Sequence, residues 1–140
     1  IFNMKTFNTD FDIYFEDISP SGMVHLEKIA EWMSMGRERF FKTTCPEYLK
    51  FVNDDVNMFT VSMTIFDIDN SQWADKIETR VAFAKIKKIS FEIHFDFYNK
   101  RKESVIAKGI QKVVFIKHRD ENFAPIPKDI DSAIKEHIKG

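Results

Sequence analysis

The chain has 140 residues, of which 44% are hydrophobic, and its formal net charge is −1 at pH 7. This length predicts one domain spanning residues 1–140, with enough apolar side chains to form a sizeable core. The near balance of charge argues against a nucleic-acid-binding protein that relies on bulk electrostatics, and against attraction to a membrane through net charge. Electrostatic recognition would therefore depend on local patches.

Cysteine content and hydropathy further limit the compartment and the kinds of site that the protein can have. The one cysteine, Cys45, excludes an internal disulfide and a multi-thiolate metal site, which fits a reducing compartment. No apolar run approaches the roughly 20 residues that cross a bilayer, and residues 1–10 lack the features of a signal peptide. No pair of histidines has the spacing of a metal site. We expect a cytoplasmic protein without a metal or cofactor.

The first predicted elements are a strand, a turn and a long helix. Hydrophobic and polar residues alternate over Phe11–Phe15, which is the period of a half-buried strand. A Pro-Ser-Gly turn follows. From Leu26 to Phe40 apolar residues recur at spacings of three and four, which predicts an amphipathic helix of roughly 18 residues. Residues 42–55 are expected to form a loop with a short helical turn.

The second half of the chain is expected to be mostly strand, because the helical period disappears there. The predicted strands are Phe59–Ile68, Lys76–Lys87, Ile89–Tyr98 and Ser104–His118. The polar sequence Asn99–Lys102 predicts a hairpin turn within an antiparallel meander. Residues 127–139 begin with Pro127 and carry an isoleucine stripe, which predicts a short closing helix. The fold class is therefore α+β.

The turn before the long helix is a candidate for polarising a carbonyl group. The first backbone N–H groups of a helix have no intrahelical acceptor and lie at the positive end of its dipole. The backbone of Gly22, Met23 and Val24 can therefore hold an oxygen that develops negative charge, and Gly22 permits close approach. The alternative is a purely structural role, in which Gly22 only makes the turn.

Arg37 is the second candidate, because helical spacing places it between Met33 and Phe40 on the apolar face. Burial of an unpaired cation is costly, so its guanidinium is expected to reach a carboxylate, backbone carbonyl groups or a ligand. The alternative is a structural ion pair, or a side chain that extends past the apolar surface to water.

The stretch Phe15–Phe41 resembles the signature of hotdog-fold thioesterases of the 4-hydroxybenzoyl-CoA type, which reads Asp-x-Asp-x-x-Gly-x-Val and continues to an Arg late in the helix. Four residues hold matching positions: Asp17, Gly22, Val24 and Arg37. Ser19 stands where this family commonly has its second Asp. The resemblance covers about Phe11 to His118 and implies a single hotdog domain, in which a curled antiparallel sheet wraps around a long central helix.

Within that family the chain most resembles the enediyne-biosynthesis branch, which acts on carrier-protein-bound polyketides. That branch keeps an Arg at the place of Arg37 and has Asn at the place of Ser19. The resemblance extends to Trp32, but the branch has a Tyr where this chain has Ile29. It implies a thioester substrate on acyl carrier protein or coenzyme A, and a homodimer or homotetramer with active sites at the dimer interface.

The catalytic residues that the resemblance implies are Ser19, Arg37, Gly22, Met23 and Val24. Ser19 can orient water or the substrate carbonyl, but a hydroxyl group without an activating partner is a poor general base. We therefore expect oxyanion stabilisation and an oriented water to contribute most to hydrolysis. His25, Asp17 and Glu27 are expected beside the substrate, and Asp17 or Glu27 is an alternative base.

Three functions stay open on the sequence. The favoured one is a thioesterase that releases a carboxylic acid from an acyl or polyketide thioester. The second is a general acyl-CoA thioesterase with another carboxylate as base, and the third is a hotdog protein that binds acyl thioesters without cleaving them. Basic residues within 85–88 and 100–102 are either solvated surface or docking sites for coenzyme A phosphates or an acidic carrier protein.

Overall fold

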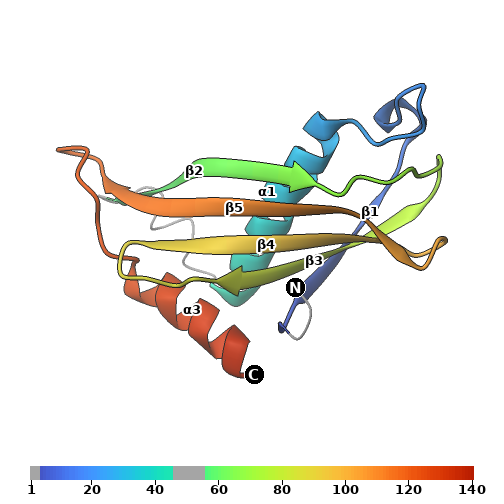
Figure 1. Ribbon diagram of the computed structural model, residues 1–140. Helices are drawn as coiled ribbons and strands as arrows, with labels where there is room; N and C mark the ends of the chain where they lie inside the picture. Colours follow the sequence, from blue (N-terminus) through green and yellow to red (C-terminus); the bar gives the residue numbers. More distant parts are fainter. Residues whose placement is uncertain (1–3, 46–55) are drawn as a thin grey trace.

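The computed structural model describes residues 4–45 and 56–140. Within these ranges the chain forms a long helix, a shorter helix and a set of strands (Figure 1). In chain order the elements are β1 (Phe7–Asp12), the 3-10 turn η1 (Phe15–Asp17), α1 (Leu26–Thr44), β2 (Val56–Phe66), β3 (Lys76–Ala84), β4 (Ser90–Asn99), β5 (Ser104–Lys117) and α3 (Lys128–Lys139). No helix in the described ranges is both long and apolar enough to cross a membrane.

The strands form one antiparallel sheet in the order β1-β3-β4-β5-β2. The long helix α1 lies against one face of this sheet, and α3 lies near the end where β3 and β4 meet (Figure 1). This arrangement confirms the expected α+β class and the single hotdog domain, with a curled antiparallel sheet around a long helix.

Alternation along the strands directs one set of side chains toward α1. The inward side chains of β4 are Phe91, Ile93, Phe95 and Phe97, each no more than 1% exposed. On the helix, Trp32, Met33 and Phe40 are equally buried and pack against them in the same core. The period-two pattern of β4 and the helical pattern of α1 therefore mark the two surfaces that pack together in the core.

Two glycines allow α1 to lie close to the sheet. A Cβ atom on Gly109 of β5 would lie 2.6 Å from Met33 Cε, closer than real Cβ contacts allow. A Cβ atom on Gly36 of α1 would lie 3.3 Å from Val81 Cγ2 on β3. The spacing between helix and sheet is therefore set at positions without a side chain.

The first strand lies earlier in the chain than the sequence period predicts. We expected a strand over Phe11–Phe15, but β1 covers Phe7–Asp12, and Phe15 lies in η1 with 79% of its surface exposed. Ile13 is nevertheless buried, because its backbone pairs with Ala74 and Asp75 outside the named strands. The alternation thus predicted the burial of Phe11 and Ile13 correctly, but it was wrong for Phe15 and for the bounds of the strand.

The other predicted elements differ from the observed ones by no more than about three residues at either end, the usual uncertainty of such bounds. The long helix continues to Thr44, so residues 42–44 of the predicted loop are helical. Residues 46–55, including the short helical turn expected there, lie outside the described residues.

Replacing Phe40 with alanine is expected to lower the free energy of unfolding by about 3–5 kcal/mol, because it leaves a cavity in the core. Phe40 is 0% exposed, and its ring centroid lies 4.5 Å from that of Phe83 and 5.6 Å from that of Phe7. Phe15→Ala removes the same group from an exposed position and should change stability by no more than about 0.5 kcal/mol. Urea unfolding measures both, and equal losses would contradict this placement of Phe40.

Candidate active site

The chain between η1 and α1 forms a narrow loop, here called the Ser19 loop (residues 18–24). Ser19 N–H donates a hydrogen bond to the Met23 carbonyl oxygen at 2.8 Å. Just outside this pair, His25 N–H donates to the Asp17 carbonyl oxygen at 2.9 Å. At the tip, Gly22 has φ +86°, a conformation that side-chain-bearing residues rarely adopt. The backbone of the loop therefore favours glycine at this position.

The Ser19 side chain is half-buried within this loop. Its hydroxyl oxygen lies 2.8 Å from Ser21 Oγ and accepts a hydrogen bond from Met23 N–H at 3.3 Å. Within the described part of the chain, no carboxylate or imidazole hydrogen-bonds to this hydroxyl. No described group therefore activates Ser19 as a base or nucleophile, although its hydroxyl can orient water or a carbonyl oxygen.

Some of the backbone donors predicted to hold an oxyanion already donate inside the loop. Gly22 N–H donates to the Ser19 carbonyl oxygen at 2.9 Å, and Met23 N–H reaches the Ser19 hydroxyl. Val24 is 2% exposed. The helix begins after His25, whose side chain makes no capping hydrogen bond. The first N–H groups of α1 thus lack a side-chain cap and are the donors best placed to hold an oxyanion.

The remaining predicted site residues surround the start of α1. Asp17 is 7% exposed, its Oδ2 accepts Tyr14 N–H at 2.9 Å, and its Oδ1 lies 3.7 Å from Lys28 Nζ. His25 and Glu27 are exposed at the helix start. Asp17 therefore supports the loop from within, whereas His25 and Glu27 lie on its outer side.

Arg37 extends from the middle of α1 toward β2 and β5. Its Nη1 donates to Thr60 Oγ1 at 2.7 Å and to Gln111 Oε1 at 3.2 Å. Thr60 lies on β2, and Gln111 lies on β5 with none of its surface exposed. Two of the acceptors of this cation are thus neutral side chains on the sheet, which helical spacing did not reveal.

Within one chain, the structure does not bring Ser19 and Arg37 together. Ser19 precedes the start of α1 at Leu26, whereas Arg37 lies 11 residues further along the helix, about 17 Å at 1.5 Å per residue. Its side chain also points to Thr60 on β2, not back toward the helix start. One thioester carbonyl therefore cannot contact both side chains of the same chain.

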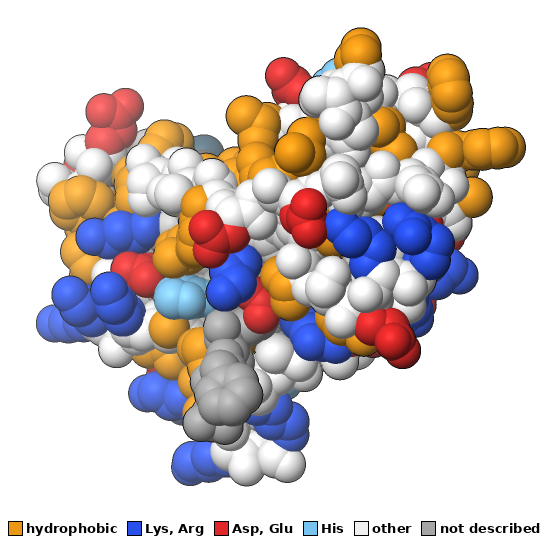
Figure 2. Space-filling model, turned by 45° about the vertical axis from the view of Figure 1, so that its right-hand side comes forward, with side chains coloured by type: hydrophobic (Ala, Val, Ile, Leu, Met, Phe, Trp, Pro, Cys, Tyr) orange, Lys and Arg blue, Asp and Glu red, His pale blue; other side chains and the backbone are white. Residues whose placement is uncertain are grey.

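Arg37 points toward an open edge of the sheet, where a register shift between Thr60 and Ser62 interrupts the regular pairing of β2 with β5. Among the described strands β2 pairs with β5 alone, and its sequence contains no charged residue and no proline. Its large exposed apolar side chains are Phe59, Val61, Met63 and Phe66, with 54%, 46%, 40% and 36% of their surfaces exposed. Figure 2 shows hydrophobic side chains gathered along the upper part of the molecule, on the side where β2 runs.

An open groove of about 490 Å³ lies beside the Ser19 loop. The residues that line it are Phe15, Ile18, Ser19, Pro20, Ser71, Gln72 and Trp73. The rings of Phe15 and Trp73 are largely exposed to solvent. They give the groove apolar walls that suit an acyl chain or another apolar group.

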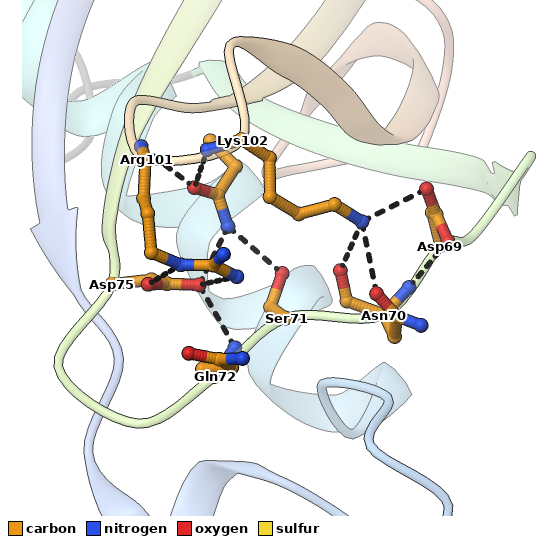
Figure 3. Close-up of polar contacts among 8 residues, drawn as sticks. Asp69, Asn70, Ser71, Gln72, Asp75, Arg101 and Lys102 are labelled. Carbon is orange, nitrogen blue, oxygen red and sulfur yellow. Dashed lines mark hydrogen bonds and ion pairs between the residues drawn. The ribbon is translucent and has the colours of Figure 1, made fainter.

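The basic side chains of the hairpin between β4 and β5 pair with carboxylates of the same chain, and Figure 3 shows the pairs of Arg101 and Lys102. The pairs are Lys100 with Asp10 at 2.8 Å, Arg101 with Asp75 at 2.7 Å and Lys102 with Asp69 at 3.0 Å. Docking of phosphates or of a carrier protein by this hairpin stays a prediction. The partnership of Arg101 with Asp75 was missed in the sequence, because no motif or spacing connects the two residues.

Comparisons with known proteins agree with this geometry. Residues 13–134 match the thioesterase-like superfamily. In fold the chain is similar to the dynemicin thioesterase, with 16% identity, a TM-score of 0.84, and coverage of 94% of this chain and 96% of that one. It is also similar to a 1,4-dihydroxy-2-naphthoyl-CoA thioesterase from Synechocystis, with 15% identity, a TM-score of 0.81, and coverage of 94% of this chain and 96% of that one. For a gentisyl-coenzyme A thioesterase the identity is 21% and the TM-score 0.75, with coverage of 90% of this chain and 98% of that one. Among curated proteins, none matches the chain significantly in sequence.

Gly22→Ala is expected to lower the free energy of unfolding by about 1–2 kcal/mol, because alanine is strained in the left-handed region. A Cβ atom there would lie 3.7 Å from its nearest neighbour, Asn70 Cβ, so the cost is conformational and not steric. Gly22→Asn is the matched control and should cost less, since asparagine tolerates this conformation better. Chemical unfolding measures both variants, and an equal loss would contradict the explanation.

Proposed function

The chain belongs to the thioesterase-like superfamily and is a thioester hydrolase, and we propose that it releases a carboxylic acid from an acyl or polyketide thioester on acyl carrier protein or coenzyme A. The observation that carries this proposal is the Ser19 loop, which places a hydroxyl group beside an apolar groove and leads directly into the start of α1. Among proteins of similar fold, the dynemicin thioesterase binds a polyene, and others are coenzyme A thioesterases.

The proposed reaction depends on polarising the thioester carbonyl. Water attacks the carbonyl carbon, the carbonyl oxygen gains negative charge, and the C–S bond then breaks. The products are a carboxylic acid and a thiol, whose sulfur receives the proton that water loses. The uncapped N–H groups of α1 stabilise the oxyanion, while Ser19 orients the water or the carbonyl. Arg37 contributes a guanidinium group that draws the carbonyl oxygen into place.

Because Ser19 and Arg37 lie apart in one chain, we propose that a homodimer completes the site. Two β2 strands paired about a two-fold axis run antiparallel, so the Phe66 end of one strand lies beside the Val56 end of the other. Such pairing also covers the exposed apolar side chains of β2 and satisfies its open edge.

Both halves of the proposed site lie along this edge. Asn70, shortly after the Phe66 end of β2, forms an isolated bridge with Met23 of the Ser19 loop. Arg37 contacts Thr60, which is nearer the Val56 end. Two-fold pairing therefore moves the Ser19 loop of one protomer toward Arg37 of its partner.

The local chemistry of Ser19 also favours a second candidate function. Because the hydroxyl group lacks an ionised hydrogen-bond partner among the described residues, the protein would bind acyl thioesters without cleaving them if water is not activated otherwise. A general acyl-CoA thioesterase instead requires a carboxylate base, for which Glu27 is exposed at the helix start and Asp17 is buried.

Thiol release from a panel of acyl-CoA and acyl-carrier-protein thioesters tests hydrolysis. We expect the wild-type protein to exceed the buffer rate, and Ser19→Ala and Arg37→Ala to lower kcat/KM by about tenfold or more, because each removes a group that orients or polarises the carbonyl. Arg39→Ala is the matched control, since this guanidinium lies on the same helix but donates to Thr9 and the Asp10 carbonyl near β1. Its activity should stay within about twofold of wild type.

Each alternative has its own outcome in this assay. Release no faster than buffer with every substrate favours the binding protein. Loss of activity in Glu27→Gln, with Ser19→Ala unaffected, favours a carboxylate base. Unchanged activity in Arg37→Ala removes Arg37 from the site.

Mixing the two inactive variants tests whether the site is shared between protomers. After subunits of Ser19→Ala and Arg37→Ala exchange, about half of the dimers are mixed, and each mixed dimer regains one site with both side chains intact. We expect recovery toward about a quarter of wild-type activity. We expect no recovery when a variant with both substitutions is mixed with either single variant. Activity equal to the average of the separate variants would place the site within one chain.

A further inference from the structure

The connection between β2 and β3 holds the Ser19 loop in place. Residues 69–75 of this connection, here called the strap, lie along the loop and form one wall of the groove. Ser71 N–H donates to the Gly22 carbonyl oxygen at 2.9 Å, and Asn70 forms an antiparallel bridge with Met23. The position of the strap therefore determines the position of the loop tip.

The strap is fastened to the hairpin between β4 and β5 through the buried carboxylate of Asp75 (Figure 3). Asp75 Oδ1 accepts Arg101 Nε at 2.7 Å, and Oδ2 accepts Arg101 Nη2 at 3.0 Å. Oδ2 also accepts Asn99 Nδ2 and the Gln72 backbone N–H, both at 2.8 Å. A two-pronged guanidinium contact of this kind fixes direction as well as distance.

The side chain of Asn99 forms hydrogen bonds with both the hairpin and the strap. This side chain is 0% exposed, and its Nδ2 also donates to Ser71 Oγ at 3.2 Å. Its Oδ1 accepts the backbone N–H groups of Arg101 and Lys102 at 3.0 and 3.1 Å. Lys102 Nζ in turn donates to the Asn70 carbonyl oxygen at 2.8 Å. The amide of Asn99 thus spans both segments with its donor and acceptor atoms in use.

The charge state of Asp75 supports this fastening. Burial by itself raises the pKa of a carboxyl group, but the hydrogen bonds from Arg101, Asn99 and the Gln72 N–H outweigh it, and the pKa of Asp75 lies below its ordinary value. The carboxylate is therefore ionised at neutral pH and pairs with a charged guanidinium group.

The backbone is strained at one position within the strap and at one position just before it. Ala74 has φ +72° and Asp67 has φ +54°, both in the left-handed region. For alanine this conformation costs about 1–2 kcal/mol and persists only where neighbouring contacts impose it. Ala74 N–H donates to the Ile13 carbonyl oxygen at 2.9 Å, and the contacts of Asp75, the next residue, hold the chain on the other side of Ala74.

Building on the thioester hydrolysis proposed above, we propose that Asp75, Asn99 and Arg101 are positioning residues for that reaction. Through the strap they fix the Gly22 carbonyl, and thereby the Ser19 loop and the start of α1. None of the three lines the groove, so they act on the substrate through the strap and not by contact.

Hydrogen exchange on the full chain tests the positioning directly. In Arg101→Ala, peptides covering residues 19–25 and 69–75 should exchange at least about tenfold faster than in wild type, while the core of β4 stays protected. Lys76→Ala is the matched control, because Lys76 adjoins Asp75 in sequence, whereas its side chain forms an exposed ion pair with Asp12, at 3.8 Å. Its exchange should match wild type in both segments.

Kinetics on the same variants distinguish positioning from simple loss of fold. At a temperature where every variant is folded, kcat of Arg101→Ala should fall about tenfold with KM within about threefold, since a displaced oxyanion site mainly affects the transition state. Arg101→Lys should recover part of kcat, because an ammonium group keeps one contact with Asp75. Lys76→Ala should keep wild-type kcat.

The outcomes separate the two proposals. Unchanged exchange at residues 19–25 in Arg101→Ala overturns the positioning role, whether or not the wild-type protein hydrolyses the thioesters. Faster exchange with unchanged kcat overturns it as well. A wild-type protein that hydrolyses none of the substrates, but whose loop responds to Arg101→Ala, overturns the proposed function alone.

Discussion

The close contact between α1 and the sheet places both parts of the candidate site. Gly36 and Gly109 remove side chains at the points of nearest approach, so the helix lies directly on the inward rings of the sheet. At this spacing Arg37 comes within hydrogen-bonding distance of Thr60 and Gln111. The same contact leaves the start of α1 at the rim, beside the Ser19 loop. A wider spacing would separate the guanidinium from its acceptors.

The elements that form this contact were predictable because burial imposes a period on the sequence. The inward face of β4 and the apolar stripe of α1 follow that period, and the structure confirms both. The period fails as a guide at the first strand, where Ile13 is buried by backbone pairing with Ala74 and Asp75, not within the sheet. Phe15 continues the same alternation but is exposed in η1, so a short alternating stretch does not show where the strand ends.

The site was predictable where a residue is unusual in its own segment. A cation on an apolar helix face and a glycine in a strand-to-helix turn drew attention to Arg37 and Gly22. Their partners come from distant segments: Gln111 is 74 residues from Arg37. In the same way, 26 residues separate Asp75 from Arg101. Contacts of this range depend on strand order, which local propensity does not encode.

The open, uncharged edge of β2 affects the solubility of the protomer and, in the proposed dimer, also its catalysis. An open strand edge without charges can pair with another extended chain, so the proposed pairing with a second copy would also protect the protomer against aggregation. A lysine at Val61 would make the single chain less prone to aggregation, and it would also oppose the β2 pairing proposed above, which brings Ser19 toward Arg37. If the proposed dimer forms, substitutions that make this strand of the single chain more soluble also weaken the assembly that completes the site.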